Sequence, residues 1–352
     1  MYRQEQTMDK IQSRSAYWDN IKGFLIFLVV FAHCLYDHQD NAAIDAIVKS
    51  IYLFHMPAFI FVSGFFGKSE RAHSEKSIFV LLFAYFIFNS ITGIIMGWTE
   101  FFDPEYSYWY ILALVIWRLA SKYVPKSRAN LVISIVFGVG IGFVPVITND
   151  FALSRAIAFF PFYLAGLITP KERFETKPKM PVPGLIALAA AVGFGYLTIR
   201  VLNIQSDEML MEAYLESAES LTRLCMFAAA SAAIIAILAF APQHKIPLLT
   251  MFGRNSLSIF LIHRLITLVF SAGIAEYRAR VMVLASVLMS FAICLAFGND
   301  AVGRLMNGYL EDGAELILRR KDPQKCSRRY TIAAVSAIIV AAAIVINGVV
   351  SM

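Results

Sequence analysis

Long apolar stretches recur along the chain and are separated by short polar connections. Each stretch is close to the length of about 20 residues that a helix needs to cross the hydrocarbon core of a bilayer. A backbone in hydrocarbon must satisfy its own hydrogen bonds, so apolar stretches of this length predict helices. The pattern predicts eleven helices, over residues 21–37, 47–66, 78–98, 106–121, 129–148, 155–169, 183–204, 221–241, 255–272, 280–298 and 331–350.

The composition agrees with this pattern. Apolar residues make up 59% of the 352 residues and charged residues 16%, against about 45–50% and about 25% in soluble globular proteins. Eleven spans leave little chain for anything outside the bilayer, so a separate soluble catalytic domain is excluded. The predicted fold class is all-α, a polytopic integral membrane protein of about eleven transmembrane helices.

The charge of the polar connections alternates, and this alternation predicts the orientation. Lys and Arg near the ends of spans are retained on the cytoplasmic side. Every second connection is basic, starting with the N-terminal segment. The N-terminus is therefore expected in the cytoplasm and, after eleven spans, the C-terminus outside. The net charge of +6 belongs to these connections, so no nucleic-acid partner is expected.

Two connections have patterns of their own. Acidic residues recur at helical intervals over 205–220, which predicts a short external amphipathic helix, serving either as a solvated face or as a lid or docking surface. Residues 301–330 place apolar positions before a basic run and are expected along the cytoplasmic interface. Gly138, Gly140 and Gly142 lie within an apolar stretch, so they predict close helix packing rather than a nucleotide-binding loop.

Three of the six histidines, His33, His55 and His263, fall within predicted spans. Ionisable residues inside a membrane are costly and mark candidate functional sites. At about 1.5 Å of rise per residue, His33 lies about 16 Å above Lys22 at the cytoplasmic edge, and the other two lie at a similar depth. In a hydrocarbon core about 30 Å thick this is near the middle. We therefore expect the three histidines to line one cavity.

The first span carries two candidate groups on one face. Lys22 and His33 are eleven residues apart, almost three whole turns of a helix. Asp19 is spaced to pair with Lys22 but is separated from His33 by about 21 Å of helix rise. This face combines an anchor for an anion at the cytoplasmic mouth with a proton acceptor deeper in the membrane. A snorkelling lysine and a hydrogen-bonded core histidine are the structural alternative.

The second span pairs His55 with a helix breaker. Pro57 frees a carbonyl about one turn earlier, which in a membrane must be satisfied by protein or by cavity water. Ser63 and Gly64 follow further along the span. The pattern predicts a kinked, polar site, with close helix packing at Ser63 and Gly64 as the alternative.

Other polar residues mark the ends of spans. Asn255 and Ser256 open the ninth span, either as helix caps or as site residues. Arg264 lies beside His263 in mid-span and needs a partner or water. Arg118 ends the fourth span on the cytoplasmic side and Arg155 begins the sixth on the outer side, where each is an interface anchor or a ligand-binding residue.

Five motifs follow one another along the first ten predicted helices. They are WDNIKGFLIFLVVFAH at 18–33, FHMPAFIFVSG at 54–64, WYILALVIWR at 109–118, RAIAFFPFYLAG at 155–166 and GRNSLSIFLIH at 253–263. Together they resemble the acyltransferase-3 family of integral membrane acyltransferases, particularly its fucose 4-O-acetylase-like branch. The chain departs from that family in two ways: Lys22 stands where many members have Arg, and an eleventh span exceeds the usual ten. Lys lacks the two parallel hydrogen bonds that Arg gives a phosphate or carboxylate.

The resemblance implies a domain organisation around a ten-helix acyltransferase core. Residues 1–20 form a cytoplasmic N-terminal segment and 21–300 the membrane acyltransferase domain. Residues 301–330 form a cytoplasmic amphipathic and basic connection, and 331–352 an additional C-terminal transmembrane helix. The expected location is the inner (plasma) membrane.

The resemblance also implies a reaction, the transfer of an acyl group, most often acetyl from acetyl-CoA, to a sugar hydroxyl. The acceptor is a surface glycan or its lipid-linked precursor, and membrane lipids and acyl-CoA are the other expected partners. We expect catalytic roles for His33, His55 and His263, and donor binding by Lys22, Arg118 and Arg254. An acceptor-binding or structural role is expected for Asp19, Ser63, Trp109, Arg155, Asn255 and Ser256.

Two other classes of protein share some of these features. A proton-coupled transporter of a sugar or organic acid also uses His and Arg residues in mid-membrane. A metal or haem protein would use the three span histidines as ligands. The sequence has no pair of histidines three or four residues apart within a span, and no metal is expected.

Overall fold

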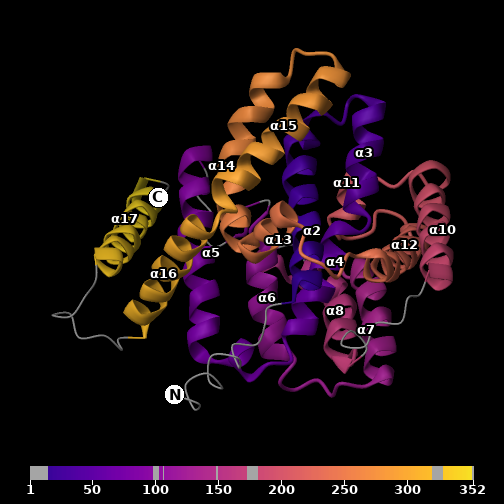
Figure 1. The fold of residues 1–352 in the computed structure, drawn as a ribbon, viewed down its shortest axis with the longest axis horizontal. Coiled ribbons are helices and arrows are strands. Elements are labelled where there is room, and N and C mark those ends of the chain that lie inside the picture. Colours follow the sequence, from indigo (N-terminus) through magenta and orange to yellow (C-terminus); the bar gives the residue numbers. More distant parts are fainter. Residues whose placement is uncertain are drawn as a thin grey trace.

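The computed structural model describes residues 15–97, 103–105, 107–147, 150–172, 181–318 and 328–350. Within these ranges the chain forms helices and no strand (Figure 1), which confirms the all-α class. The α-helices are α2 (Ala16–Leu35), α3 (Ala42–Tyr52), α4 (His55–Phe66), α5 (Glu75–Met96), α6 (Trp109–Ala120), α7 (Arg128–Gly140), α8 (Leu153–Ile168), α10 (Pro181–Tyr196), α11 (Ser206–Met209), α12 (Glu219–Phe240), α13 (Pro247–Arg254), α14 (Ser256–Ile274), α15 (Ala279–Phe297), α16 (Asp300–Ile317) and α17 (Arg328–Val350).

Eight helical segments among the described residues are long and apolar enough to cross a membrane, and three shorter ones, Trp109–Ala120, Arg128–Phe143 and Arg329–Val340, are apolar as well. Each of these eleven segments overlaps one of the predicted stretches. The membrane character is therefore confirmed. The number of eleven spans stays a prediction, because α6 and α7 fall below the length of a full span.

Helix α2 lies in the middle of the molecule (Figure 1) and packs against α4, α13, α14 and α15. Its contact with α13 depends on two glycines. A Cβ at Gly23 would collide with the carbonyl of Leu249, and one at Gly253 would collide with the carbonyl of Asp19. Small residues let membrane helices approach this closely. The contact fixes the start of α14 beside α2, which brings the histidines of the two helices together.

A second close contact joins α4 and α8. A Cβ at Gly64 would meet the backbone of Tyr163, and one at Gly166 would meet the carbonyl of Phe61. The close-packing alternative is therefore confirmed for Gly64. Gly138 and Gly142 are also contact positions, against the carbonyl of Ala158 and the ring of Tyr214, whereas Gly140 has no atom within 4 Å of a Cβ.

The predicted kink in the second span is a complete break. Helix α3 ends at Tyr52, α4 begins at His55, and Phe54 between them has a non-helical backbone. Pro57 is in the first turn of α4, where its missing N–H costs no helical hydrogen bond. The break therefore precedes the proline, and it places His55 at the start of a helix within the membrane.

The predicted external helix over 205–220 is wrong. Only α11 forms, a single turn, and Met211 has a left-handed backbone with φ of 62°. In a longer helix the backbone carbonyls of Leu210 and Glu212 would accept hydrogen bonds from amides one turn later. Here they accept from side chains of other helices instead. Arg155 Nε donates to the carbonyl of Leu210 at 2.9 Å, and Arg223 Nη2 donates to that of Glu212 at 2.7 Å. These bonds hold the segment against α8 and α12.

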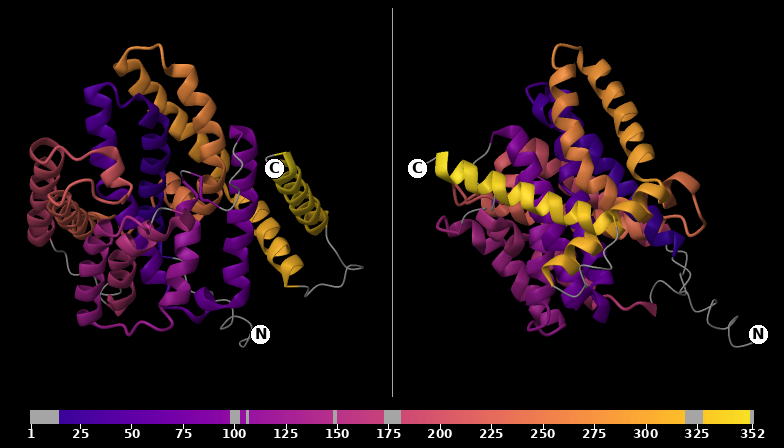
Figure 2. Two further views of the ribbon diagram at one scale, coloured as in Figure 1. Left: turned by 180° about the vertical axis from the view of Figure 1, so that it is seen from behind. Right: turned by 90° about the vertical axis from the view of Figure 1, so that its left-hand side faces the viewer.

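The C-terminal helices lie to one side of the core. Helix α16 packs against α5, α14 and α17, and Arg329 of α17 pairs with Asp312 of α16 at 3.4 Å. In the right-hand view of Figure 2, α17 runs at a wide angle to α14 and α15. The basic residues Arg319, Arg320, Lys321 and Lys325 lie outside the described residues. The crossing of the membrane by α17 stays a prediction.

The orientation can be checked by labelling introduced cysteines. Cys34, Cys225 and Cys294 are buried, so a Cys326→Ser background leaves little native reactivity. We expect impermeant thiol reagents to label Glu70→Cys only from the cytoplasm and Leu215→Cys only from outside, because the basic connections are retained inside. Leu215 is 94% exposed. Labelling in the opposite sense would reverse the topology.

Candidate active site

His33 of α2 and His263 of α14 are in direct contact. The Nδ1 of His33 and the Nε2 of His263 are 2.8 Å apart, and the two rings lie nearly parallel with centroids 5.0 Å apart. His33 is 7% exposed and His263 is fully buried. The sequence predicted that these two residues lie at the same depth, and a hydrogen bond joins them.

The surrounding hydrogen bonds determine which nitrogen of each ring carries a proton. His263 Nδ1 lies 2.6 Å from the carbonyl of Phe260, which only accepts, so His263 Nδ1 is the donor. In a neutral ring His263 Nε2 then accepts, and the proton of its bond with His33 comes from His33 Nδ1. His33 Nε2 therefore keeps its lone pair. A histidine with Nδ1 held in this way is arranged to act as a base through Nε2.

His55 is held in the same sense at the α3–α4 break. Its Nδ1 donates to the carbonyl of Ile51 at 2.8 Å, so the lone pair is again on Nε2. The ring of Tyr52 lies between the histidines, with centroids 4.9 Å from His55 and 6.3 Å from His33. The two histidines face a common cavity from different helices.

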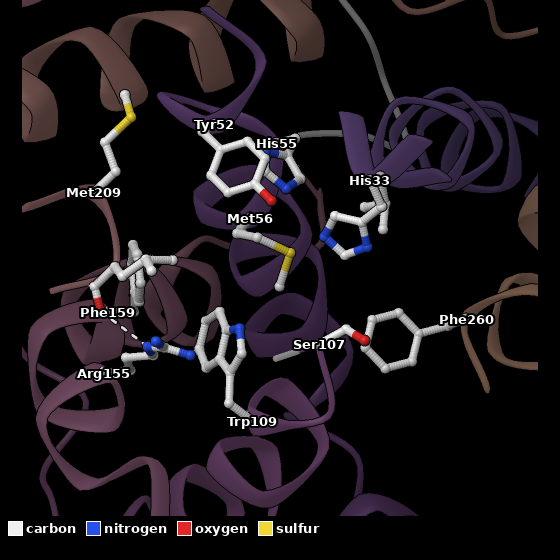
Figure 3. Close-up of a pocket in the computed structure, with 12 residues that line it drawn as sticks. His33, Tyr52, His55, Met56, Ser107, Trp109, Arg155, Phe159, Met209 and Phe260 are labelled. Atoms are coloured by element: carbon white, nitrogen blue, oxygen red, sulfur yellow. Dashed lines mark hydrogen bonds between the residues drawn. The ribbon is translucent and has the colours of Figure 1, made fainter. Parts of the chain in front are cut away.

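This cavity, the histidine cavity, is drawn in Figure 3. Its walls come from α2, the α3–α4 break, α6, α8, α14 and the segment after α11. Its lining residues are Val29, His33, Tyr52, His55, Met56, Ser107, Trp109, Arg155, Phe159, Met209, Leu210 and Phe260. His263 is absent from this lining, so the expectation that all three histidines line one cavity is wrong for it. His263 supports His33 from behind.

One wall of the histidine cavity contains a cation beside an indole. The guanidinium of Arg155 lies 5.7 Å from the centroid of the Trp109 ring, within the range of a cation–π contact. Trp109 in turn stacks on Phe159. Arg155 also binds the carbonyl of Leu210, so the segment after α11 closes this side of the cavity. A lid was one of the alternatives that the sequence left open for this segment, although as a helix.

A second cavity lies on the side of the predicted cytoplasmic mouth, and we call it the donor cavity because Lys22 and Arg118, two residues expected to bind the donor, line it. It is lined by Lys22, Val29, Met56, Phe59, Ser63, Leu81, Tyr110, Ile111, Leu114, Arg118, Ser256, Leu257 and Phe260. Four residues singled out from the sequence thus meet in one place, two of them cationic. The two cavities share Val29, Met56 and Phe260 and so adjoin each other.

The cations of the donor cavity differ in their partners. Lys22 pairs with Asp19 at 2.7 Å, which confirms the pairing expected from their spacing. Arg118 is largely buried, and its Nε has no hydrogen-bond partner among the described residues. Ser63 and Tyr110 share a hydrogen bond of 2.5 Å nearby. A largely buried guanidinium that has no carboxylate partner in the described part of the chain favours an anionic ligand.

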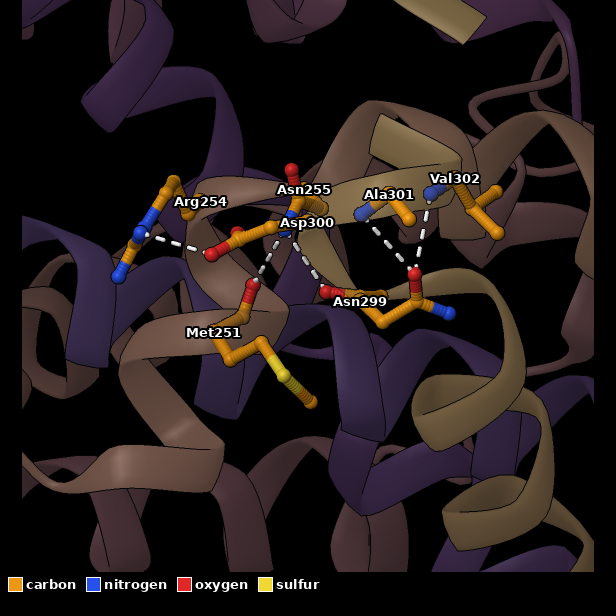
Figure 4. A network of polar contacts seen from close by, with 8 residues as sticks. Met251, Arg254, Asn255, Asn299, Asp300, Ala301 and Val302 are labelled. Carbon is orange, nitrogen blue, oxygen red and sulfur yellow. Dashed lines mark hydrogen bonds and ion pairs between the residues drawn. The ribbon is translucent and has the colours of Figure 1, made fainter. Parts of the chain in front are cut away.

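Arg254 and Asn255 lie elsewhere, in the network of Figure 4. Arg254 pairs with Asp300 at 3.1 Å. Asn255 Nδ2 donates to the carbonyl of Gly298 at 2.8 Å and to Asp300 Oδ1 at 2.9 Å. The Asn255 side chain makes no capping bond to α14. Both residues join the α13–α14 break to the start of α16, and neither lines the histidine cavity or the donor cavity.

The mid-span Arg264 has a partner that the sequence did not reveal. Its guanidinium binds Glu105 Oε1 at 3.0 Å, and Glu105 is 1% exposed. Glu105 comes from the connection between α5 and α6, which we expected at the outer surface. Burial raises the pKa of the Glu105 carboxyl, and Arg264 opposes this rise. The pair anchors the connection that carries Ser107 and Tyr108 to α14.

A family comparison bears on the same residues. A model of an acyltransferase domain matches residues 15–299. The chain belongs to the acyltransferase-3 family. The match includes every residue of the two cavities and ends before α16, so α16 and α17 lie beyond the acyltransferase-3 domain.

Among the described residues no group of three or more His, Cys, Asp or Glu side chains is arranged to hold a metal ion.

Two curated relatives carry the name nodulation protein NolL. This acyltransferase-3 chain is 25% identical over 182 residues to NolL of Sinorhizobium fredii, covering 44% of this chain and 49% of the relative. It is 25% identical over 181 residues to NolL of Mesorhizobium japonicum, covering 44% and 48%. The matched region thus spans about half the length of these relatives. No solved structure matches the chain.

Proposed function

We propose that this membrane acyltransferase transfers acetyl from acetyl-CoA to a hydroxyl group of a glycan or glycolipid. The observation that carries the proposal is the contact of His33 Nδ1 with His263 Nε2, from which the tautomer of His33 follows. A buried base with its lone pair on Nε2 faces a cavity that adjoins a second, cation-lined cavity. A reaction between a thioester and a hydroxyl needs a base where the two substrates meet.

The reaction follows from the roles of these groups. The acceptor hydroxyl donates its proton to His33 Nε2 while its oxygen attacks the thioester carbonyl carbon. The tetrahedral intermediate collapses, the carbon–sulfur bond breaks, and the proton on His33 passes to the departing thiolate of CoA. The products are an O-acyl ester and free CoA. His263 keeps His33 in the required tautomer through its bond to Nδ1.

The two ends of the cavities suit the two substrates. Lys22 and Arg118 provide positive charge for the phosphates of CoA at the mouth of the donor cavity. At the other end, Trp109 provides an apolar face and Arg155 a hydrogen-bond donor for a sugar. A sugar oxygen that replaces the Leu210 carbonyl at Arg155 would open the wall formed by the segment after α11. We propose the inner membrane as the location, with the donor entering from the cytoplasm.

Purified protein in lipid nanodiscs tests the proposal. With acetyl-CoA and a panel of glycan and glycolipid acceptors, we expect release of free CoA that depends on the acceptor, together with an acetyl ester detected by mass spectrometry. The His33→Ala protein is the control for spontaneous hydrolysis. Uptake of a sugar or organic acid driven by a proton gradient, without any CoA-dependent product, would instead favour the proton-coupled transporter.

The role of Lys22 can be tested by reversing its charge. We expect Lys22→Glu to weaken the apparent affinity for acetyl-CoA about tenfold or more through repulsion of the phosphates, whereas Lys22→Arg preserves or improves it. Because Lys22 also pairs with Asp19, Lys76→Glu is a matched charge reversal outside the donor cavity. The measurement is the KM for acetyl-CoA. Equal values in the parent and both Lys22 variants would remove Lys22 from donor binding.

A further inference from the structure

The boundary between the donor cavity and the histidine cavity consists of three apolar side chains. Val29, Met56 and Phe260 line both cavities. They come from α2, α4 and α14, so they meet from three directions. We call these three residues the collar. The collar therefore lies where the two cavities adjoin.

Each collar residue lies next to one of the three histidines in the sequence or one helical turn before it. Val29 is four residues before His33 and Phe260 three residues before His263, so each is one helical turn nearer the donor cavity. Met56 directly follows His55. Figure 3 shows the Met56 side chain between the Tyr52–His55 side of the cavity and Trp109, beside the ring of His33.

Two of the three collar side chains are held firmly. Val29 is 1% exposed and has a β-branched side chain with one strongly preferred rotamer in a helix. Phe260 is 6% exposed, and its ring packs against Tyr110 and His263 with centroids 5.5 Å away in each case. Met56 is half-buried and is the flexible member. The width of the passage is therefore set mainly by Val29 and Phe260, with Met56 adjusting to what passes.

We propose that the collar selects the acyl donor by the length of its acyl chain and restricts transfer to short groups such as acetyl. This inference rests on the proposed function and deepens it. The thioester carbonyl must reach His33 Nε2, so the acyl chain lies at the collar or just beyond it during the reaction. Each added methylene then competes for space with fixed side chains, and close-packed walls resist such insertion.

The size of the expected preference between acyl donors can be estimated from other enzymes. One extra methylene in a fitted apolar pocket changes kcat/KM by about 10-fold to 200-fold. The parent is therefore expected to prefer acetyl-CoA over propionyl-CoA, and propionyl-CoA over butyryl-CoA. Removing volume from the collar should relax this order without removing the base.

The experiment compares kcat/KM for acetyl-, propionyl- and butyryl-CoA in the parent and in Val29→Ala and Met56→Ala. We expect Val29→Ala to raise the butyryl-to-acetyl ratio by about 10-fold or more. Met56→Ala should raise it by a smaller factor, because the flexible Met56 side chain already adjusts. Phe59→Ala is the matched control, because Phe59 lines the donor cavity but not the histidine cavity. It should change the rates with all three donors by similar factors and leave the ratio unchanged.

Each outcome has a definite meaning. An unchanged ratio in both collar variants that still transfer acetyl, or an equal change in Phe59→Ala, overturns the collar while leaving the proposed function intact. If the parent transfers none of the three acyl groups to any acceptor, the proposed function fails and the collar with it. Two independent collar variants are used so that poor folding of one, seen by size-exclusion chromatography, leaves the other to decide.

Discussion

Replacing His33 with alanine is expected to lower acyl transfer by about 10²-fold to 10⁴-fold, the usual contribution of a positioned base. The reason is that the His33 ring lines the histidine cavity and its Nδ1 bonds to His263, which leaves the lone pair on Nε2. The measurement is acceptor-dependent release of CoA by purified protein. Its KM for acetyl-CoA should change little, because the cations of the donor cavity remain.

The matched control for this variant is His38→Ala. His38 is 6% exposed, close to the 7% of His33, and its ring lies 3.0 Å from the carbonyl of Ser271, outside both cavities. Both variants lose a buried histidine near the same end of α2. Transfer at the parental rate by a monodisperse His33→Ala protein would show that another group acts as the base.

His263 is expected to have the second largest effect although it touches neither cavity. Removing its acceptor nitrogen in His263→Ala frees His33 to rotate and to exchange tautomers. We expect kcat to fall about 10-fold to 100-fold, by analogy with metal-bound histidines that lose the group orienting their ring. The KM for acetyl-CoA should stay close to that of the parent, because His263 is a positioning residue.

Rescue by a conservative variant distinguishes positioning from simple packing. The side-chain oxygen of glutamine can occupy the place of Nε2, so His263→Gln can still accept the proton of His33 Nδ1. We expect it to recover part of the lost kcat, whereas His263→Leu, of similar size but without an acceptor, should resemble alanine. Equal activity of the glutamine and leucine variants would contradict the positioning role.

The sequence alone determined the features that depend on local geometry. Helix rise and period are constants of the backbone, so the shared face of Lys22 and His33 follows from their spacing, as does the pairing of Lys22 with Asp19. The length of the apolar stretches identified the helices, and the cost of burying ionisable groups marked the histidines. The resemblance to the acyltransferase-3 family added the order of the motifs, which the family match supports.

Only the tertiary structure decided how the helices face one another. The helix rise per residue predicts how far along α14 His263 lies, but not how α14 is rotated about its own axis. The glycine contact between α2 and α13 helps to set that rotation. That rotation turns His263 toward His33 and out of the cavity lining. It also brings Glu105, 159 residues away in the chain, to Arg264. Periodicity carries no information about such partners, because they belong to different elements.

The failed prediction over 205–220 has the same physical origin. The acidic spacing there is compatible with a helix, but a carbonyl can accept from whichever donor lies closest in the folded protein. Arg155 and Arg223, from two other helices, take the carbonyls of Leu210 and Glu212. The sequence thus determined where the long apolar helices form and which polar residues lie within them. The packing of distant helices decided which of these residues share a hydrogen bond, a cavity or the collar, since those relations depend on rotation and contact between elements.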